Sequence, residues 1–195
     1  KPLRAAVIAK NRVEVPAVMN ALSFAGIVAT SLHPMGAIED YLYVIEDAEI
    51  DLLVYDADHF EDIAAQLKVR APRIAHFIAI GAEGVGASID TLSEGYKPQP
   101  LVAPTAEPND MARIAYSGGT TGKPKGIMVT HRTMVTSTMI QLTEWEWPSE
   151  IRHLVCAPLS HAGASVLTAV LLKGGLMVVV PGFEPVAVMQ AIEQR

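Results

Sequence analysis

Strand-like and helix-like segments alternate through the first eighty residues, and this alternation constrains the fold more than any other feature of the sequence. Short apolar runs suited to buried strands are separated by segments whose apolar residues recur at helical spacing. Parallel strands need crossover helices of this kind between them. The pattern predicts an α/β fold of largely parallel β-sheets flanked by helices, with strands at 3–9, 27–32, 52–55 and 74–80 and helices at 13–24, 38–46 and 60–69.

The pattern stops at residue 81, where glycine, proline, serine and charged residues take over as far as residue 110. This composition predicts a connecting segment on the surface. We therefore expect a first α/β unit at 1–80, a connecting segment at 81–110 and a second α/β unit at 111–195. The second unit is predicted to contain a strand at 111–116, extended chain at 127–129, a helix at 131–142 with Thr130 as N-cap, and a helix, turn and strand over 166–180.

A glycine-rich loop directly follows the predicted strand at 111–116. Glycines let backbone N–H groups approach an anion, hydroxyl groups donate hydrogen bonds, and lysines supply positive charge. The loop therefore predicts a site for the phosphates of ATP, and an ordinary turn between two elements is the alternative. It is not a Walker A loop, because the glycine and the hydroxyl residue required there are replaced by Ser117 and Pro124. The predicted phosphate-binding residues are Ser117, Gly118, Gly119, Thr120, Thr121, Gly122, Lys123 and Lys125.

A second segment, Pro158-Leu159-Ser160-His161-Ala162-Gly163, follows an apolar run that begins at Leu154. Ligand sites in open α/β sheets lie at the carboxyl ends of strands, which makes His161 a candidate binding residue. The alternative is a histidine that caps or packs against the following helix. The residues alone leave both interpretations open.

The order of residues in the loop, Tyr-x-x-Gly-Thr-Thr-Gly-Lys-Pro-Lys-Gly from Tyr116 to Gly126, resembles the signature of the AMP-forming adenylating enzymes, which include acyl- and aryl-CoA ligases. Gly118 stands where that family more often has serine. The segment at 158–163 is similar to a family segment of the form Pro-Leu-x-His, although Ser160 replaces a frequent aromatic residue. The resemblance implies part of the large N-terminal domain of an acyl-CoA synthetase-like fold. It also implies that His161, Ala162 and Gly163 form the carboxylate and acyl site.

The resemblance further implies a reaction for the full-length parent enzyme. A fatty or aromatic carboxylic acid reacts with ATP and Mg²⁺ to form an acyl-adenylate, and coenzyme A then takes the acyl group. An acid without an α-ammonium group is expected, because the segment around His161 lacks the aspartate of the amino-acid-activating branch. An acyl-AMP ligase that loads a carrier protein, or a non-catalytic nucleotide-binding or interaction module, are alternatives.

Members of the family are longer than this chain, and their catalytic lysine lies in a C-terminal lid that has no counterpart here. We therefore expect an N-terminal fragment that is inactive in isolation, and no residue of the chain is predicted to be catalytic. The metal-binding residues and the oligomeric state are left unassigned.

Composition narrows the partners and the compartment. The formal charge of −6 argues against nucleic-acid binding. The most apolar stretch, 166–180, is interrupted by Lys173-Gly174-Gly175 and is too short to span a membrane, although peripheral association stays open. A single cysteine excludes an internal disulfide and is compatible with a cytoplasmic location.

Overall fold

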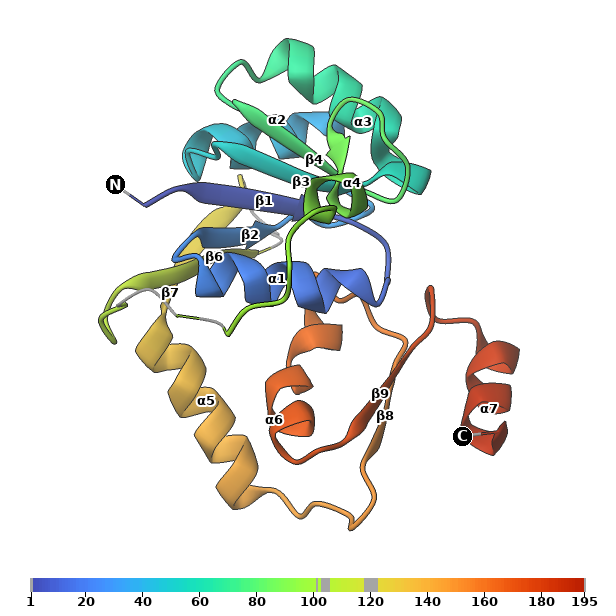
Figure 1. Ribbon diagram of the computed structural model, residues 1–195. Coiled ribbons are helices and arrows are strands. Elements are labelled where there is room, and N and C mark those ends of the chain that lie inside the picture. Colours follow the sequence, from blue (N-terminus) through green and yellow to red (C-terminus); the bar gives the residue numbers. More distant parts are fainter. Residues whose placement is uncertain (1, 101, 103–105, 118–122, 195) are drawn as a thin grey trace.

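A seven-stranded β-sheet organises the computed structural model, which describes residues 2–100, 102, 106–117 and 123–194. The strand order is β5-β4-β3-β1-β2-β6-β7, and every neighbouring pair is parallel except the antiparallel pair β6–β7 (Figure 1). The predicted α/β class with a largely parallel sheet is therefore confirmed. The strands are β1 (Arg4–Ile8), β2 (Val28–Ser31), β3 (Leu52–Asp56), β4 (His76–Ile80), β5 (Ala87–Ser88), β6 (Met111–Ser117) and β7 (Lys125–Thr130).

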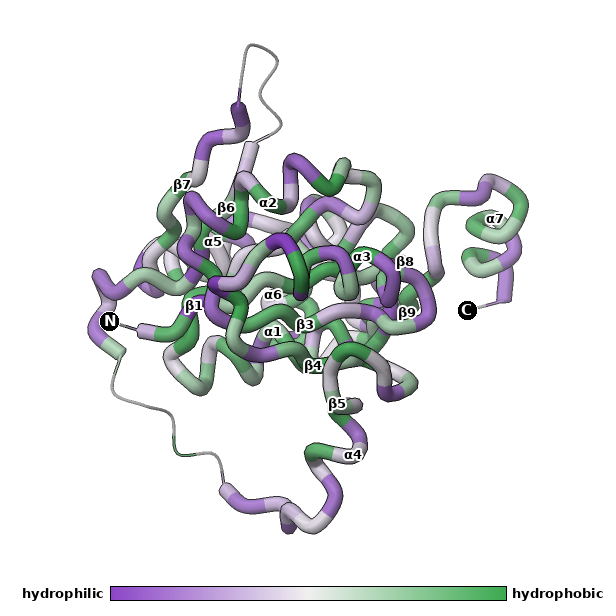
Figure 2. The backbone as a smooth tube through the Cα atoms, turned by 90° about the horizontal axis from the view of Figure 1, so that it is seen from above, coloured by the Kyte–Doolittle hydropathy of each residue, from purple (hydrophilic) through white to green (hydrophobic). Residues whose placement is uncertain are grey.

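Helices cover both faces of this sheet. Helix α1 (Glu14–Phe24) lies on one face, and α2 (Ile38–Asp47) and α3 (Ala57–Arg70) lie on the other (Figure 1). The central strand β3 is buried along its whole length, and its residues alternate between the two faces. The apolar residues Leu52 to Tyr55 suit a strand that is buried on both faces, and the buried Asp56 at its end is paired with Arg12. The hydrophobic centre of the molecule is visible in Figure 2.

The segment 81–110 contains two short elements, β5 and the helix α4 (Ile89–Ser93), in addition to connecting chain. They form because Ser88 Oγ donates to the carbonyl oxygen of Gly81 at 2.7 Å and accepts from the amide of Asp90 at 3.2 Å, which caps α4. The backbone also runs close to β4: a Cβ on Gly86 would lie 2.3 Å from the carbonyl oxygen of Phe77. The glycine and the serine thus hold a fifth strand at the edge of the sheet.

A second, two-stranded sheet is formed by the parallel strands β8 (Arg152–Val155) and β9 (Leu176–Val179). Val155 and Leu159 belong to the same apolar cluster as Val15 and Val18 of α1, so α1 lies between the two sheets. The remaining elements are α5 (His131–Glu144), the 3₁₀ turn η1 (Ala162–Ala164), α6 (Leu167–Leu172) and α7 (Pro185–Gln194). Both views show α7 standing apart from the rest of the chain (Figures 1 and 2).

The structure contains two of the features predicted for the second unit. The helix–turn–strand expected over 166–180 is confirmed as α6 and β9, and Thr130 is the N-cap of α5, where its side-chain oxygen accepts from the amide of Thr133 at 3.2 Å. The large sheet continues across the predicted unit boundary, because β6 pairs with β2. The division at 81–110 stays a prediction. None of the helices in the described residues is both long and apolar enough to cross a membrane.

Candidate functional site

The flanks of the glycine-rich loop come together at one end of the large sheet. Ser117 is the last residue of β6 and Lys125 the first residue of β7, and the two face each other in the antiparallel register. Both are exposed. The loop residues Gly118, Gly119, Thr120, Thr121 and Gly122 lie outside the described residues. A serine and a lysine therefore stand on opposite sides of the predicted phosphate loop.

The two lysines of the loop have different surroundings. Lys123 Nζ lies 5.1 Å from the centroid of the Tyr43 ring on α2, within the range of a cation–π interaction. Lys125 is exposed at the start of β7. The ammonium group of Lys123 thus contacts an aromatic ring, whereas no such contact is found for Lys125 among the described residues. This agrees with Lys125 as the stronger candidate for binding phosphate.

Tyr116 anchors the strand before the loop to α2. Its hydroxyl donates to Asp47 at 2.5 Å, and burial, followed by this hydrogen bond and the charge of Asp47, raises the pKa of Tyr116 well above its usual value. Tyr116 is therefore neutral at every physiological pH and acts as a hydrogen-bond donor. This contact ties the entry of the phosphate loop to the sheet-covering helix.

A tight turn positions His161. The backbone amides of His161 and Gly163 both donate to the carbonyl oxygen of Pro158 at 3.0 Å. A Cβ on Gly163 would lie 2.3 Å from the carbonyl oxygen of Ala157, so only glycine lets the turn close. Gly163 is buried whereas His161 and Ala162 are exposed. Of the three residues predicted for the carboxylate and acyl site, Gly163 shapes the turn and the other two are exposed beside it.

Asn11, in the loop after β1, fastens this turn to the large sheet. Its side-chain amide donates to the carbonyl oxygens of Ala157 at 3.0 Å and Val180 at 3.1 Å, and its Oδ1 accepts from the amide of Leu159 at 2.8 Å. All three bonds join the ends of β8 and β9 to the end of β1. The His161 turn is thus held in register with the carboxyl edge of the large sheet.

A cavity of about 250 Å³ brings the two sequence motifs together. Ser117 and Pro124, from the flanks of the phosphate loop, line it together with His161. The remaining walls come from the end of β2, the turn that follows it and α2, including His33 and Tyr41. Two segments far apart in the sequence, each predicted to bind a different part of the substrates, therefore share one cavity.

The His161 ring is neutral under ordinary conditions. Its pKa is lowered below the ordinary value near 6.5, first by partial burial of the ring and then by the charge of His33. Ser160 Oγ lies 2.9 Å from His161 Nδ1, and the direction of that bond depends on the tautomer. A neutral imidazole can donate or accept a hydrogen bond, so it can orient a carboxylate without a permanent ion pair.

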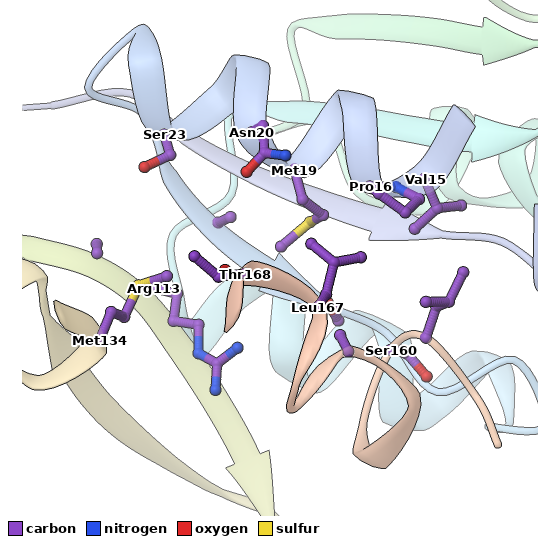
Figure 3. A pocket seen from close by; sticks show the side chains of 15 residues that line it. Val15, Pro16, Met19, Asn20, Ser23, Arg113, Met134, Ser160, Leu167 and Thr168 are labelled. Carbon is purple, nitrogen blue, oxygen red and sulfur yellow. The ribbon is translucent and has the colours of Figure 1, made fainter. Parts of the chain in front are cut away.

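An apolar pocket of about 110 Å³ lies next to this cavity, where α1, β2, β6, α5 and α6 meet (Figure 3). Figure 3 shows Met19 and Met134 extending into it from α1 and α5, with Arg113 near its rim. Ser31 lines both this pocket and the cavity at His161. The space around His161 is therefore bordered by apolar surface as well as by the phosphate loop.

Sequence reasoning did not assign a role to His33, and the structure places it against His161. The available signal was its position directly after the predicted strand at 27–32, because the carboxyl ends of parallel strands share one edge of the sheet. What the sequence lacked was the strand order. Since β2 lies beside β6, the residue after β2 reaches the same cavity as the end of β6.

No group of three or more His, Cys, Asp or Glu side chains within the described ranges is placed to hold a metal ion. The metal-binding residues therefore stay unassigned.

Comparison with known proteins gives consistent results along the whole chain. The family model described as "AMP-binding enzyme" matches residues 2–195. A medium/long-chain-fatty-acid–CoA ligase, FadD8 of Mycobacterium tuberculosis, is 38% identical over 195 residues, which is 97% of this chain and 34% of the ligase. The chain thus spans about a third of the length of this relative.

Solved structures share the fold. An amide bond synthetase, McbA of Marinactinospora thermotolerans, superposes with a TM-score of 0.85 at 25% identity, covering 100% of this chain and 38% of that one. A protein of Rhodopseudomonas palustris described as a long-chain-fatty-acid CoA ligase has a TM-score of 0.85 at 20% identity, covering 99% and 48%. The architecture of this chain therefore recurs as part of larger proteins.

Proposed function

The chain belongs to the AMP-binding enzyme family, and from this membership we propose that the whole protein is an ATP-dependent acid–CoA ligase. It activates a fatty or aromatic carboxylic acid as an acyl-adenylate and then forms a thioester with coenzyme A. Several relatives support this activity, because they are named as CoA ligases for fatty acids, 2-succinylbenzoate and malonate and as a feruloyl-CoA synthase. The observation that carries the proposal is the cavity shared by the phosphate-loop flanks and His161.

The chemistry assigns a task to each side of that cavity. The carboxylate attacks the α-phosphorus of ATP, and negative charge builds on the phosphate oxygens as pyrophosphate leaves. Donors and cations aimed at those oxygens stabilise the transition state. The proposed cradle is Ser117, Lys125 and the residues between them, with Lys123 in a lesser role. His161, which lines the same cavity, orients the carboxylate.

The remaining assignments follow from this activity. We assign ATP, coenzyme A and a small-molecule acid as substrates, Mg²⁺ as the ion bound with ATP, and the cytoplasm as the location. Mg²⁺ supplies charge neutralisation for the phosphates when it is bound, and no step is assigned to it through residues of this chain. Transfer to a carrier protein is the alternative second step, and no described residue favours it over coenzyme A.

The first test concerns the phosphate cradle. In the whole enzyme, Lys125→Ala should lower the rate of acid-dependent pyrophosphate exchange by roughly tenfold, which corresponds to about 1.4 kcal/mol of transition-state stabilisation. Lys173→Ala is the matched control, because Lys173 is an exposed lysine outside the site. Equal rates for the wild type and Lys125→Ala would remove Lys125 from the cradle. Absence of any acid-dependent exchange in the wild type would reject the proposed activity.

The same assay separates the two interpretations of His161. If the ring orients the acid, His161→Ala should lower kcat/KM for the acid much more than for ATP and should alter the preference for acyl-chain length. If the ring has only a structural role, His161→Ala should instead lower the free energy of unfolding by about 1 kcal/mol, and with it Tm, and leave the acid preference unaltered. Measuring Tm together with the chain-length profile decides between them.

A further inference from the structure

Three hydrogen bonds fix His33 in the turn after β2. Its Nδ1 accepts the amide of Met35 at 3.1 Å, and its carbonyl oxygen accepts the amide of Gly36 at 2.9 Å and the hydroxyl of Tyr41 at 2.7 Å. The turn packs tightly on α2, because a Cβ on Gly36 would lie 2.6 Å from Tyr41 Cε1. Since Nδ1 is an acceptor, the proton of the neutral His33 ring lies on Nε2. Both the place and the tautomer of this imidazole are thereby set.

The His33 and His161 rings meet edge to face. Their centroids are 4.9 Å apart, and the ring planes are inclined by 66°. This arrangement is the favourable one for two aromatic rings, because the positive edge of one faces the negative face of the other. It joins the turn after β2 to the turn after β8, and both rings line the cavity that contains Ser117 and Pro124.

The pair has no carboxylate partner among the described residues. The hydrogen bonds found for the two rings there go to the Met35 amide and to Ser160 Oγ. Asp40, which also lines the cavity, accepts the amide of Ala37 at 3.2 Å. His161 also lines a second cavity, of about 290 Å³, beside β6. The titratable and charged groups that line this cavity and the 250 Å³ cavity, apart from His161 itself, are His33, Asp40, Tyr41, Arg113 and Tyr116.

Charge repulsion follows from this geometry. Two imidazolium ions at 4.9 Å repel each other, so protonation of one ring opposes protonation of the other. The lowered pKa of His161, which burial and the charge of His33 produce, agrees with this. A pair that lacks an internal counter-ion is stabilised in its protonated form by an anion from outside. The carboxylate of an organic acid supplies such an anion.

We propose that His33 is the positioning partner of His161, and that the two imidazoles act as one unit that takes up a single proton from solvent when a carboxylate binds beside them. The identity of the anion as the substrate acid rests on the proposed function. The pairing of the rings does not, because it is a property of this chain alone. His33 acts through His161 and touches no reacting atom in this assignment.

The first experiment uses the 195-residue chain and follows the ring Cε1–H signals of its six histidines by NMR as a function of pH. His33→Phe keeps an aromatic ring beside His161 and removes the charge, whereas His33→Gln keeps an acceptor for the Met35 amide and removes the ring. In both variants the titration midpoint of His161 should rise, by about 0.6 pH unit as Coulomb repulsion across 4.9 Å of water predicts. His76→Gln is the control, because His76 is exposed on β4 and should leave the midpoint unaltered. An unaltered His161 midpoint in His33→Phe would overturn the pairing. That is the result expected if His33 only fills space, because phenylalanine fills the same space.

The second experiment adds sodium benzoate or sodium octanoate to the wild-type chain, with sodium chloride at the same ionic strength as control. The His161 midpoint should rise with the carboxylates and not with chloride, and this rise should be smaller in His33→Phe. A His161 midpoint that does not respond to either carboxylate would overturn the anion-linked protonation. The pairing of the two rings is tested separately, by the first experiment.

The third measurement separates this proposal from the proposed function. In the whole enzyme, His33→Phe should raise KM for the acid by roughly tenfold and leave KM for ATP within about twofold, as expected when only one ligand's contacts change. An unchanged KM for the acid would remove His33 from the acid site. If the whole enzyme activates no acid at all, the proposed function is rejected. The NMR titrations of the 195-residue chain would still decide whether the two histidines are coupled.

Discussion

In residues 4–80, here called the first region, each of the three helices buries apolar residues, whereas residues 125–194, the second region, leave several apolar faces uncovered. In the first region α2 buries Tyr41, Val44 and Ile45 against the sheet. In the second region the 14-residue helix α5 has no buried residue, and neither has α7. Large apolar side chains are exposed along both of these helices, for example Val135 and Ile192.

The difference comes from the surface that each sheet offers. The first region contains the central strands of a seven-stranded sheet, which presents two broad apolar faces. The second region has a two-stranded sheet, β8–β9, and such a sheet has little surface on which a helix can bury a whole face. The cavity at His161 therefore lies at the junction of a well-packed part and a sparsely packed part of the described chain.

The largest expected effect comes from a matched pair of isoleucines on helices. Ile45 on α2 is 1% exposed and Ile140 on α5 is 52% exposed. Ile45→Ala should lower the free energy of unfolding by about 3 kcal/mol, because it leaves a cavity in the core, and Ile140→Ala should alter it by less than about 0.5 kcal/mol. Urea unfolding of both variants measures this. Equal losses would show that α5 is buried in solution and would remove the contrast between the regions.

A smaller effect tests the tightly packed turn at His161 in the second region. Gly163→Ala should cost about 1–3 kcal/mol, because the new Cβ meets the carbonyl oxygen of Ala157 and the backbone must shift. Gly182→Ala is the control, since a Cβ there meets no atom within 4 Å. Thermal unfolding of the two variants gives the comparison. If both glycines tolerate alanine equally, the His161 turn is looser than its geometry indicates.

The smallest effect concerns the local support of α5, which lacks core contacts. Thr130→Ala removes the side-chain acceptor for the Thr133 amide and should cost about 1 kcal/mol of helix stability. Thr136→Ala, in the exposed middle of the same helix, should be neutral or slightly stabilising, because alanine has the higher helix propensity. Hydrogen exchange of the α5 amides is the measurement. Similar exchange in both variants would mean that packing, and not the cap, holds α5.

Much of the fold could be predicted from residues near one another in the chain. The strand and helix positions of the first region follow from apolar periodicity, and the cap at Thr130 follows from a hydroxyl residue just before a helical pattern. The elements β5 and α4 could not be predicted in this way, because Ser88 and Gly86 are held by partners on β4 and in the loop after it. Local patterns carry no information about such partners.

The candidate site also has features that follow from the local sequence and features that follow only from tertiary packing. By itself the sequence determined its chemistry: a loop of glycines, hydroxyls and lysines, and a histidine after an apolar strand. The tertiary structure alone decided that Ser117, His33 and His161 share a cavity, because this depends on β2 lying next to β6 and on Asn11 tying the ends of β8 and β9 to the end of β1. Periodicity and motifs are local properties of a chain, whereas strand order and contacts between loops are properties of its packing.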